Sequence, residues 1–162
     1  MDPIVALLVG LVVGSVLTGV FVLWLMRTKM VVAQRSARSF EDTCATVEEV
    51  VEDAKGWGFP IDSWDMYRTF ADKDLVPDGF RKLRIYFVCN AGFASRLLSS
   101  VPGFVGMMPC TWAVYELDDG SVHLSKLNIG LMSRMFDGPV REVMGKVARA
   151  DDEFVPVALG TN

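Results

Sequence analysis

The sequence contains one histidine, His123, and three cysteines, none of them in a C-x-x-C pair. A single histidine excludes metal sites that need several histidines, and the cysteine spacing lacks the usual sign of a zinc or dithiol motif. No Ser-His-Asp set with diagnostic spacing is present, and the glycines form no phosphate-binding pattern. Because the sequence shows no catalytic set, we do not expect an enzyme.

Charge and proline are both absent from Ile4 to Met26. A helix rises about 1.5 Å per residue, so this segment can cross a hydrocarbon core roughly 30 Å thick, and a helix satisfies its own backbone groups in lipid. The amino terminus lacks the basic residues of a signal peptide, and no small-residue cleavage site follows the segment. We therefore expect an uncleaved, single-pass transmembrane anchor.

Four basic side chains follow this segment closely: Arg27, Lys29, Arg35 and Arg38. No basic side chain precedes it. The positive-inside rule then places the amino terminus outside the inner cell membrane and the remaining domain in the cytoplasm. In that reducing compartment we expect thiols at all three cysteines, Cys44, Cys89 and Cys110. The net charge is −4, and the sequence has no basic stripe with interleaved aromatic residues. We therefore do not expect the protein to bind nucleic acid.

Small residues recur every four positions within the apolar segment, at Ala6, Gly10, Gly14 and Thr18. Such a stripe lets two helix backbones approach closely, and packing drives helix association in lipid. Glycine is also simply common in membrane helices. The pattern favours a packing face, which would serve either a homo-oligomer or another membrane protein.

The chain is expected to comprise an anchor with its basic collar over 1–29, one domain over 30–156 and a tail over 157–162. Hydrophobic periods and turn signals predict strands at 30–34, 84–89, 111–117 and 122–127, and helices at 40–57, 91–100 and from Pro139 onwards. The run 84–89 is expected to be a central strand buried on both faces. The class is α+β, with an antiparallel-rich sheet and helices packed on one face.

Several side chains could carry chemistry. Cys89 ends the central strand and Cys110 begins the hairpin, so the two thiols could bind a soft metal or form a disulfide, or each could be a small buried hydrophobe. His123 alternates with apolar neighbours and is expected to face away from the core. Methionines cluster at Met107, Met108, Met132, Met135 and Met144. Their flexible thioethers suit either an irregular core or an adaptable binding surface.

Three segments together resemble the domain-of-unknown-function 302 family over roughly residues 30–155: SFEDTCATVEEVVEDAKGWGF, IYFVCNAGFASRLL and GMMPCTWAVYELDDGSVHLSKLNIGLM. The most specific positions are Cys89-Asn90, Met108-Pro109-Cys110 and Val114-Tyr115-Glu116. Family members typically have proline after the Cys-Asn pair, where this chain has Ala91. The resemblance implies a compact α+β domain, often dimeric, with no established activity.

Two functions from different classes follow from the sequence. The first is a membrane-anchored accessory or interaction protein whose cytoplasmic domain binds a partner or a small ligand, as a subunit of a larger membrane complex or on its own. The alternative is a redox or soft-metal protein, for haem or copper, that uses Cys89 and Cys110. The site candidates are Cys89, Asn90, Met108, Cys110 and Glu116, and the sequence names no cofactor.

Overall fold

The computed structural model describes residues 2–161, except for the side chain of Ala6. The chain divides into two compact units, residues 1–30 and residues 31–162. Each is described by itself.

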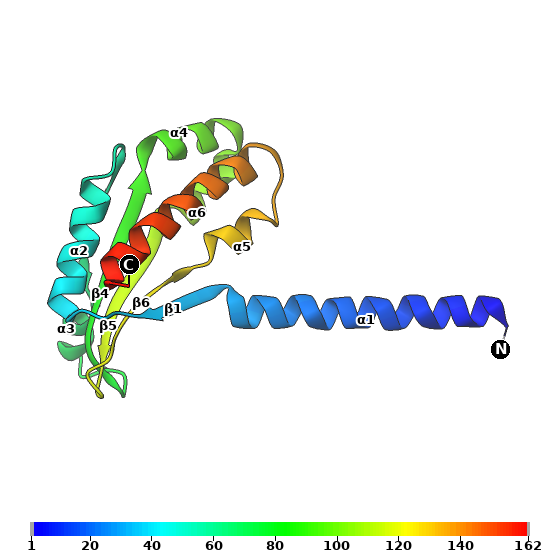
Figure 1. Ribbon diagram of the computed structural model, residues 1–162, viewed down its shortest axis with the longest axis horizontal. Coiled ribbons are helices and arrows are strands. Elements are labelled where there is room, and N and C mark those ends of the chain that lie inside the picture. Colours follow the sequence, from blue (N-terminus) through cyan, green and yellow to red (C-terminus); the bar gives the residue numbers. More distant parts are fainter. Residues whose placement is uncertain (1, 162) are drawn as a thin grey trace. The chain divides into compact units, whose positions relative to one another are not determined.

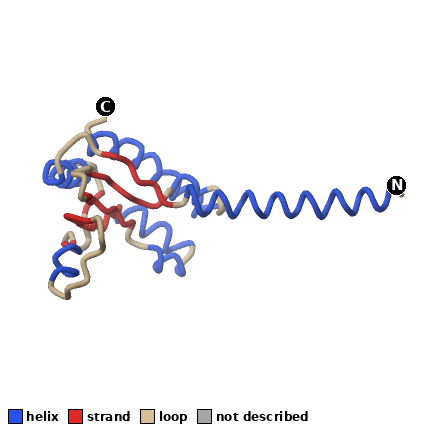
Figure 2. Tube along the Cα trace, turned by 90° about the horizontal axis from the view of Figure 1, so that it is seen from below, coloured by secondary structure: helices blue, strands red, loops and turns tan. Residues whose placement is uncertain are grey.

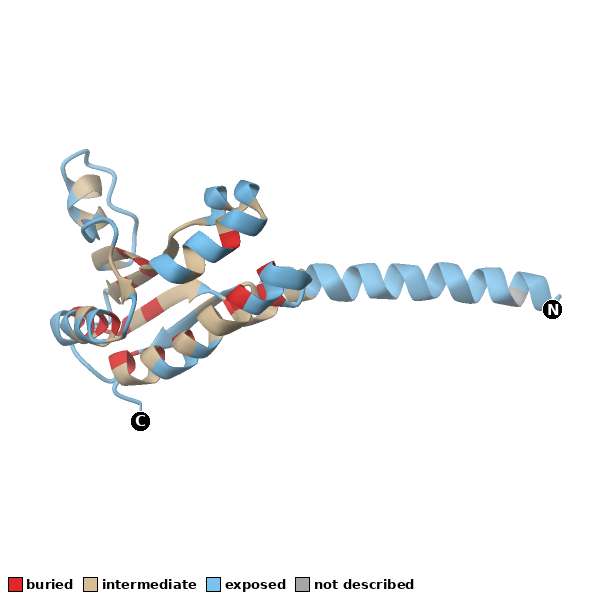
Figure 3. Cartoon of the chain, turned by 90° about the horizontal axis from the view of Figure 1, so that it is seen from above, coloured by how far each residue is buried: buried red, intermediate tan, exposed pale blue. Residues whose placement is uncertain are grey.

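The first unit is a single helix, α1 (Pro3–Lys29). The carboxylate of Asp2 caps it by accepting a hydrogen bond from the backbone N–H of Ile4, at 3.0 Å. In the described part of the chain it is the one helix long and apolar enough to span a membrane, and none of its most apolar stretch is buried (Figure 3). The expected packing stripe is uncovered at Gly10 and Gly14, while its Ala6 position lies outside the described side chains.

The second unit is built on an antiparallel sheet, whose strands are red in Figure 2. The strand order is β1-β6-β5-β4-β2. The strands are β1 (Val31–Arg35), β2 (Trp57–Gly58), β3 (Trp64–Asp65), β4 (Phe80–Asn90), β5 (Cys110–Leu117) and β6 (Val122–Leu127). The short β3 pairs with the middle of β4 on the same edge as β2. A tight turn ending at Gly120, whose φ is +78°, joins β5 to β6 as the Asp-Asp-Gly signal predicts.

Helices connect and cover these strands (Figure 1). They are α2 (Phe40–Glu52), α3 (Met66–Ala71), α4 (Ala91–Ser100), the 3₁₀ helix η1 (Pro102–Met107), α5 (Ile129–Ser133) and α6 (Gly138–Leu159). Ser39 caps α2, its hydroxyl oxygen accepting from the N–H of Asp42 at 3.1 Å. Gly160, with φ at +68°, ends α6 in the left-handed conformation that glycine adopts without strain.

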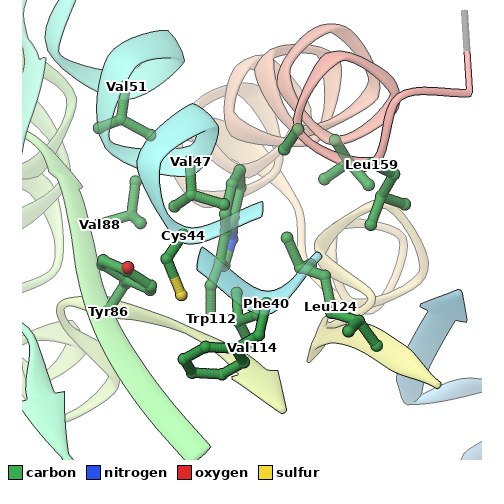
Figure 4. Packing of buried hydrophobic residues seen from close by; sticks show 13 residues of the cluster. Phe40, Cys44, Val47, Val51, Tyr86, Val88, Trp112, Val114, Leu124 and Leu159 are labelled. Carbon is green, nitrogen blue, oxygen red and sulfur yellow. The ribbon is translucent and has the colours of Figure 1, made fainter. Parts of the chain in front are cut away.

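The core lies between the sheet and the pair α2 and α6 (Figure 4). Trp112 and Val114 from β5 meet Val47 of α2, and each of these side chains is at most 1% exposed. Leu159 joins the same cluster from the last turn of α6, within the stretch predicted as a tail, because α6 keeps its apolar stripe through Pro156. This packing joins β4, β5 and β6 to α2 and α6 in one core.

The α+β class, with an antiparallel sheet and packed helices, is confirmed. The expectation of a central strand buried on both faces is wrong. In β4 only Tyr86 and Val88, two positions apart, are buried, so one face of this strand packs on the core and the other stays partly exposed. The short elements α3, η1 and α5 were not predicted, since five or six residues carry too little periodicity.

Candidate functional site

A cavity of about 520 Å³ lies at one end of the sheet. Its floor comes from the end of β4, the start of β5 and the end of β6, and its walls come from α4 and η1 on one side and α5 and α6 on the other. This volume falls within the range of small-molecule sites, roughly 300–1,000 Å³. A cavity this large, lined mainly by apolar side chains, is the strongest candidate site in the described part of the chain.

Aromatic and methionine side chains dominate the lining. Trp57 and Phe93 meet edge to face there, with ring centroids 6.0 Å apart. Four of the five clustered methionines line the cavity: Met107, Met108, Met132 and Met144. The fifth, Met135, is 56% exposed and lies outside it. Unbranched thioethers repack easily, so this wall can adapt to apolar molecules of different shapes.

Cys89 and Cys110 both line the cavity, but the sheet does not face them toward each other. Cys110 lies opposite Val88 in the β4–β5 register, and Cys89 pairs with Gly58 on β2. Successive side chains leave a strand on opposite faces, so the register directs the two cysteines to different faces. All three cysteines are free thiols.

The fold also holds these thiols in their protonated form. Burial raises the pKa of Cys110 to about 11, and the nearby Asp151 carboxylate acts in the same direction. Burial likewise raises the pKa of Cys89. Because the thiolate is the nucleophile and the metal ligand, these raised pKa values disfavour redox and soft-metal chemistry at Cys89 and Cys110 near neutral pH. In the described residues no group of three or more His, Cys, Asp or Glu side chains could hold a metal ion.

The other sequence-predicted residues divide between the cavity and a distant surface. Asn90 lines the cavity and caps α4, its side-chain oxygen accepting from the N–H of Phe93 at 3.0 Å. Met108 lines the cavity next to Pro109. Glu116 lies near the other end of β5 and pairs with Lys82 at 3.3 Å, so it is not brought to the cysteines.

Sequence reasoning missed a buried ion pair beside the cavity. Lys126 lines the cavity from β6, and its Nζ lies 2.5 Å from a carboxylate oxygen of Asp151 on α6. The two side chains are only 12% and 4% exposed. A signal was available, because Lys126 shares one strand face with the buried Val122 and Leu124. Asp151 similarly lies on the apolar stripe of α6.

The two walls are linked at the surface by polar and aromatic contacts. Arg96 of α4 pairs with Glu142 of α6 at 2.9 Å, and both side chains are about half exposed. Phe104 of η1 meets Phe136, which follows α5, edge to face with centroids 5.2 Å apart. Exposed ion pairs contribute little stability, commonly below about 1 kcal/mol. The Arg96–Glu142 pair therefore adds little to the stability of the contact between the two walls.

His123 lies outside the cavity, on the sheet face away from α2 and α6. It is half-buried and stacks on Tyr115, with ring centroids 5.2 Å apart. Its Nδ1 is buried and has no hydrogen-bond partner among the described residues. The expected direction, away from the core, agrees with the burial of Val122 and Leu124 on either side, although the ring is stacked rather than freely solvated.

Comparison with known proteins identifies a family and a protein of similar fold. The family described as "Domain of unknown function DUF302" matches residues 32–154. An uncharacterised conserved DUF302 protein from Bacillus stearothermophilus has a similar crystal structure, with a TM-score of 0.67 and 18% identity over 83% of this chain and 98% of that one. At this identity the likeness shows the fold alone.

A curated uncharacterised protein from Aquifex aeolicus (strain VF5) is 31% identical over 48 residues. The match covers 30% of this chain and 33% of that protein. It therefore adds no information about activity.

Proposed function

The chain belongs to the DUF302 domain family, and from this premise we propose that it is a single-pass membrane protein whose DUF302 domain binds a small apolar molecule. The cavity at the end of the sheet carries the proposal, because its volume and its lining of aromatic and methionine side chains suit such a molecule. The topology is part of the proposal: the amino terminus lies outside and the domain in the cytoplasm.

The short connection between α1 and the domain supports a ligand that dissolves in lipid. The apolar helix α1 ends at Lys29, and β1 begins at Val31. Within the domain, Val31 pairs with Leu127, which lines the cavity. Only Met30 therefore separates the apolar helix from a strand that borders the site. A protein tethered this closely to a bilayer suits the binding of molecules that partition into lipid.

Photolabelling tests the proposal. Full-length protein in lipid nanodiscs is exposed to a dodecane carrying a diazirine, and the labelled peptides are mapped by mass spectrometry. We expect labels on α1, which any lipid probe reaches, and on the cavity walls at α4, η1 and α6. The half-buried Ala94 lines the cavity, so Ala94→Phe should fill part of it and remove the wall labels.

The matched control is Ala71→Phe, at an exposed helix position that does not line the cavity. This variant should keep the wall labels. Labels confined to α1 in the unaltered protein would contradict the proposed function. So would wall labels that persist at full strength in a folded Ala94→Phe variant.

A further inference from the structure

Lys126 is the one charged side chain among the residues that line the cavity, all of which the structure describes. Removing an ammonium group from water is costly, and the contact with Asp151 offsets part of that cost. An ammonium group carries three hydrogen-bond donors, and the bond to Asp151 uses one. Lys126 can therefore also donate to a molecule in the cavity.

The ion pair also limits the charge of that molecule. Lys126 and Asp151 together are neutral, so the cavity holds no uncompensated positive charge for an anion. A carboxylate placed at Lys126 would lie close to the carboxylate of Asp151 in an apolar environment, where like charges repel strongly. Burial already raises the pKa of Asp151 above its ordinary value, which shows how unfavourable negative charge is here. An uncharged oxygen meets no such repulsion.

We infer that the cavity takes an alkyl chain that ends in an uncharged hydroxyl or carbonyl oxygen, with this oxygen accepting a hydrogen bond from Nζ of Lys126. The inference rests on the proposed function and adds the chemical class of the ligand. The methionine and aromatic walls hold the chain, and the neutral ion pair recognises its polar end.

Competition against the diazirine-dodecane probe tests this inference. Full-length protein in nanodiscs is labelled in the presence of 1-dodecanol, dodecanoate or dodecane, each at a measured mole fraction in the bilayer. We expect 1-dodecanol to protect the cavity walls at about a tenfold lower mole fraction than dodecane, as one hydrogen bond to a charged donor would produce. Dodecanoate at pH 7.5 should be no better than dodecane.

Two variants separate recognition from folding. In Lys126→Met/Asp151→Leu both charges are removed together, so the advantage of 1-dodecanol should disappear while dodecane still competes. In Asp151→Asn the charge of Lys126 is no longer neutralised, so the preference should move to dodecanoate. A misfolded protein cannot produce this gain. The control Lys82→Met removes another paired strand lysine, outside the cavity, and should keep the preference for 1-dodecanol.

The outcomes distinguish the two proposals. The inference about the ligand's polar end would be overturned if 1-dodecanol and dodecane competed equally, or if dodecanoate competed most strongly in the unaltered protein. Neither result would contradict the binding of an apolar molecule in the cavity. An absence of cavity labels with every probe would overturn the proposed function itself.

Discussion

At the scale of single residues, the cavity protects a cysteine from ionisation. The pKa of Cys110 is about 11, against an ordinary value of 9.0, with burial as the main cause. At pH 8 its thiolate fraction should therefore be about a hundredfold lower than that of an exposed cysteine. We expect iodoacetamide to alkylate Cys110 at least a hundredfold more slowly than a cysteine in a short peptide, with a rate that keeps rising up to about pH 11.

Site-resolved mass spectrometry of the alkylated protein measures this rate. The more exposed Cys89 provides an internal comparison and should react faster. Rapid alkylation of Cys110 at pH 7 would revive the redox and soft-metal alternative, because it would show a thiolate that the structure does not predict.

The ion pair of Lys126 and Asp151 gives a second residue-scale prediction. Lys126→Met leaves a buried carboxylate unpaired and should lower the free energy of unfolding by about 3 kcal/mol at pH 8. Without the ammonium, which lowers the pKa of Asp151, that pKa rises further. A carboxyl group whose pKa is higher in the folded than in the unfolded protein makes the folded protein less stable as the pH rises. The loss of unfolding free energy in Lys126→Met should therefore be smaller at pH 5 than at pH 8.

Denaturant unfolding in detergent, followed by tryptophan fluorescence, measures both effects. The double variant Lys126→Met/Asp151→Leu serves as the control and should recover most of the loss, since removing both charges leaves nothing unpaired. A Lys126→Met variant with the same deficit at pH 5 and pH 8 would show that Asp151 does not take up a proton.

At the scale of elements, the cap of α2 makes a local contribution to stability. The Ser39 hydroxyl accepts from Asp42 N–H and donates to the Asp42 carboxylate at 2.8 Å. Ser39→Ala should therefore lower the free energy of unfolding by about 1 kcal/mol. Glu49→Ala, at an exposed position of the same helix, is the control and should change it little. If Ser39→Ala lowers the free energy of unfolding no more than the control does, water must replace Ser39 as the hydrogen-bond acceptor for the Asp42 N–H.

The small-residue stripe of α1 remains a prediction. Gly10 and Gly14 have open space around them, and Thr18 donates to the carbonyl of Gly14 at 2.8 Å, which leaves a flat apolar surface. Gly14→Ile should reduce helix association severalfold in a membrane two-hybrid or crosslinking assay, because a branched side chain keeps two backbones apart. Leu11→Ile, which places the same β-branched side chain beside the stripe and not on it, is the control and should leave association unchanged. Unchanged association in the Gly14 variant would exclude this stripe as the interface.

Elements with strong periodicity could be predicted from the sequence, and short or tertiary features could not. Alternation located β6, and capping at Ser39 located the start of α2, but α2 ends at Glu52, five residues before the predicted end, and Trp57 lies in β2. The sequence singled out Cys89, Asn90, Met108 and Cys110, which do line one cavity. It could not show that the register separates the two thiols, nor that Lys126 meets Asp151 across 25 positions, because both depend on how β6 and α6 pack.

At the scale of the whole molecule, the topology is the open prediction. The basic residues in the last turn of α1, Arg27 and Lys29, and those beyond it, Arg35 and Arg38, should hold the domain in the cytoplasm. Protease added to sealed inverted vesicles should then digest the domain, whereas right-side-out vesicles should protect it. Protection in inverted vesicles and digestion in right-side-out ones would place the domain outside and reverse the proposed orientation.

The binding of an apolar molecule in the cavity is tested most directly by mass spectrometry under non-denaturing conditions, with protein gently extracted from its own membrane. We expect an additional small-molecule mass that organic denaturation releases, that persists in Ala71→Phe and that disappears in Ala94→Phe. Folded protein that carries no such mass, or carries it equally in both variants, would contradict binding in this cavity.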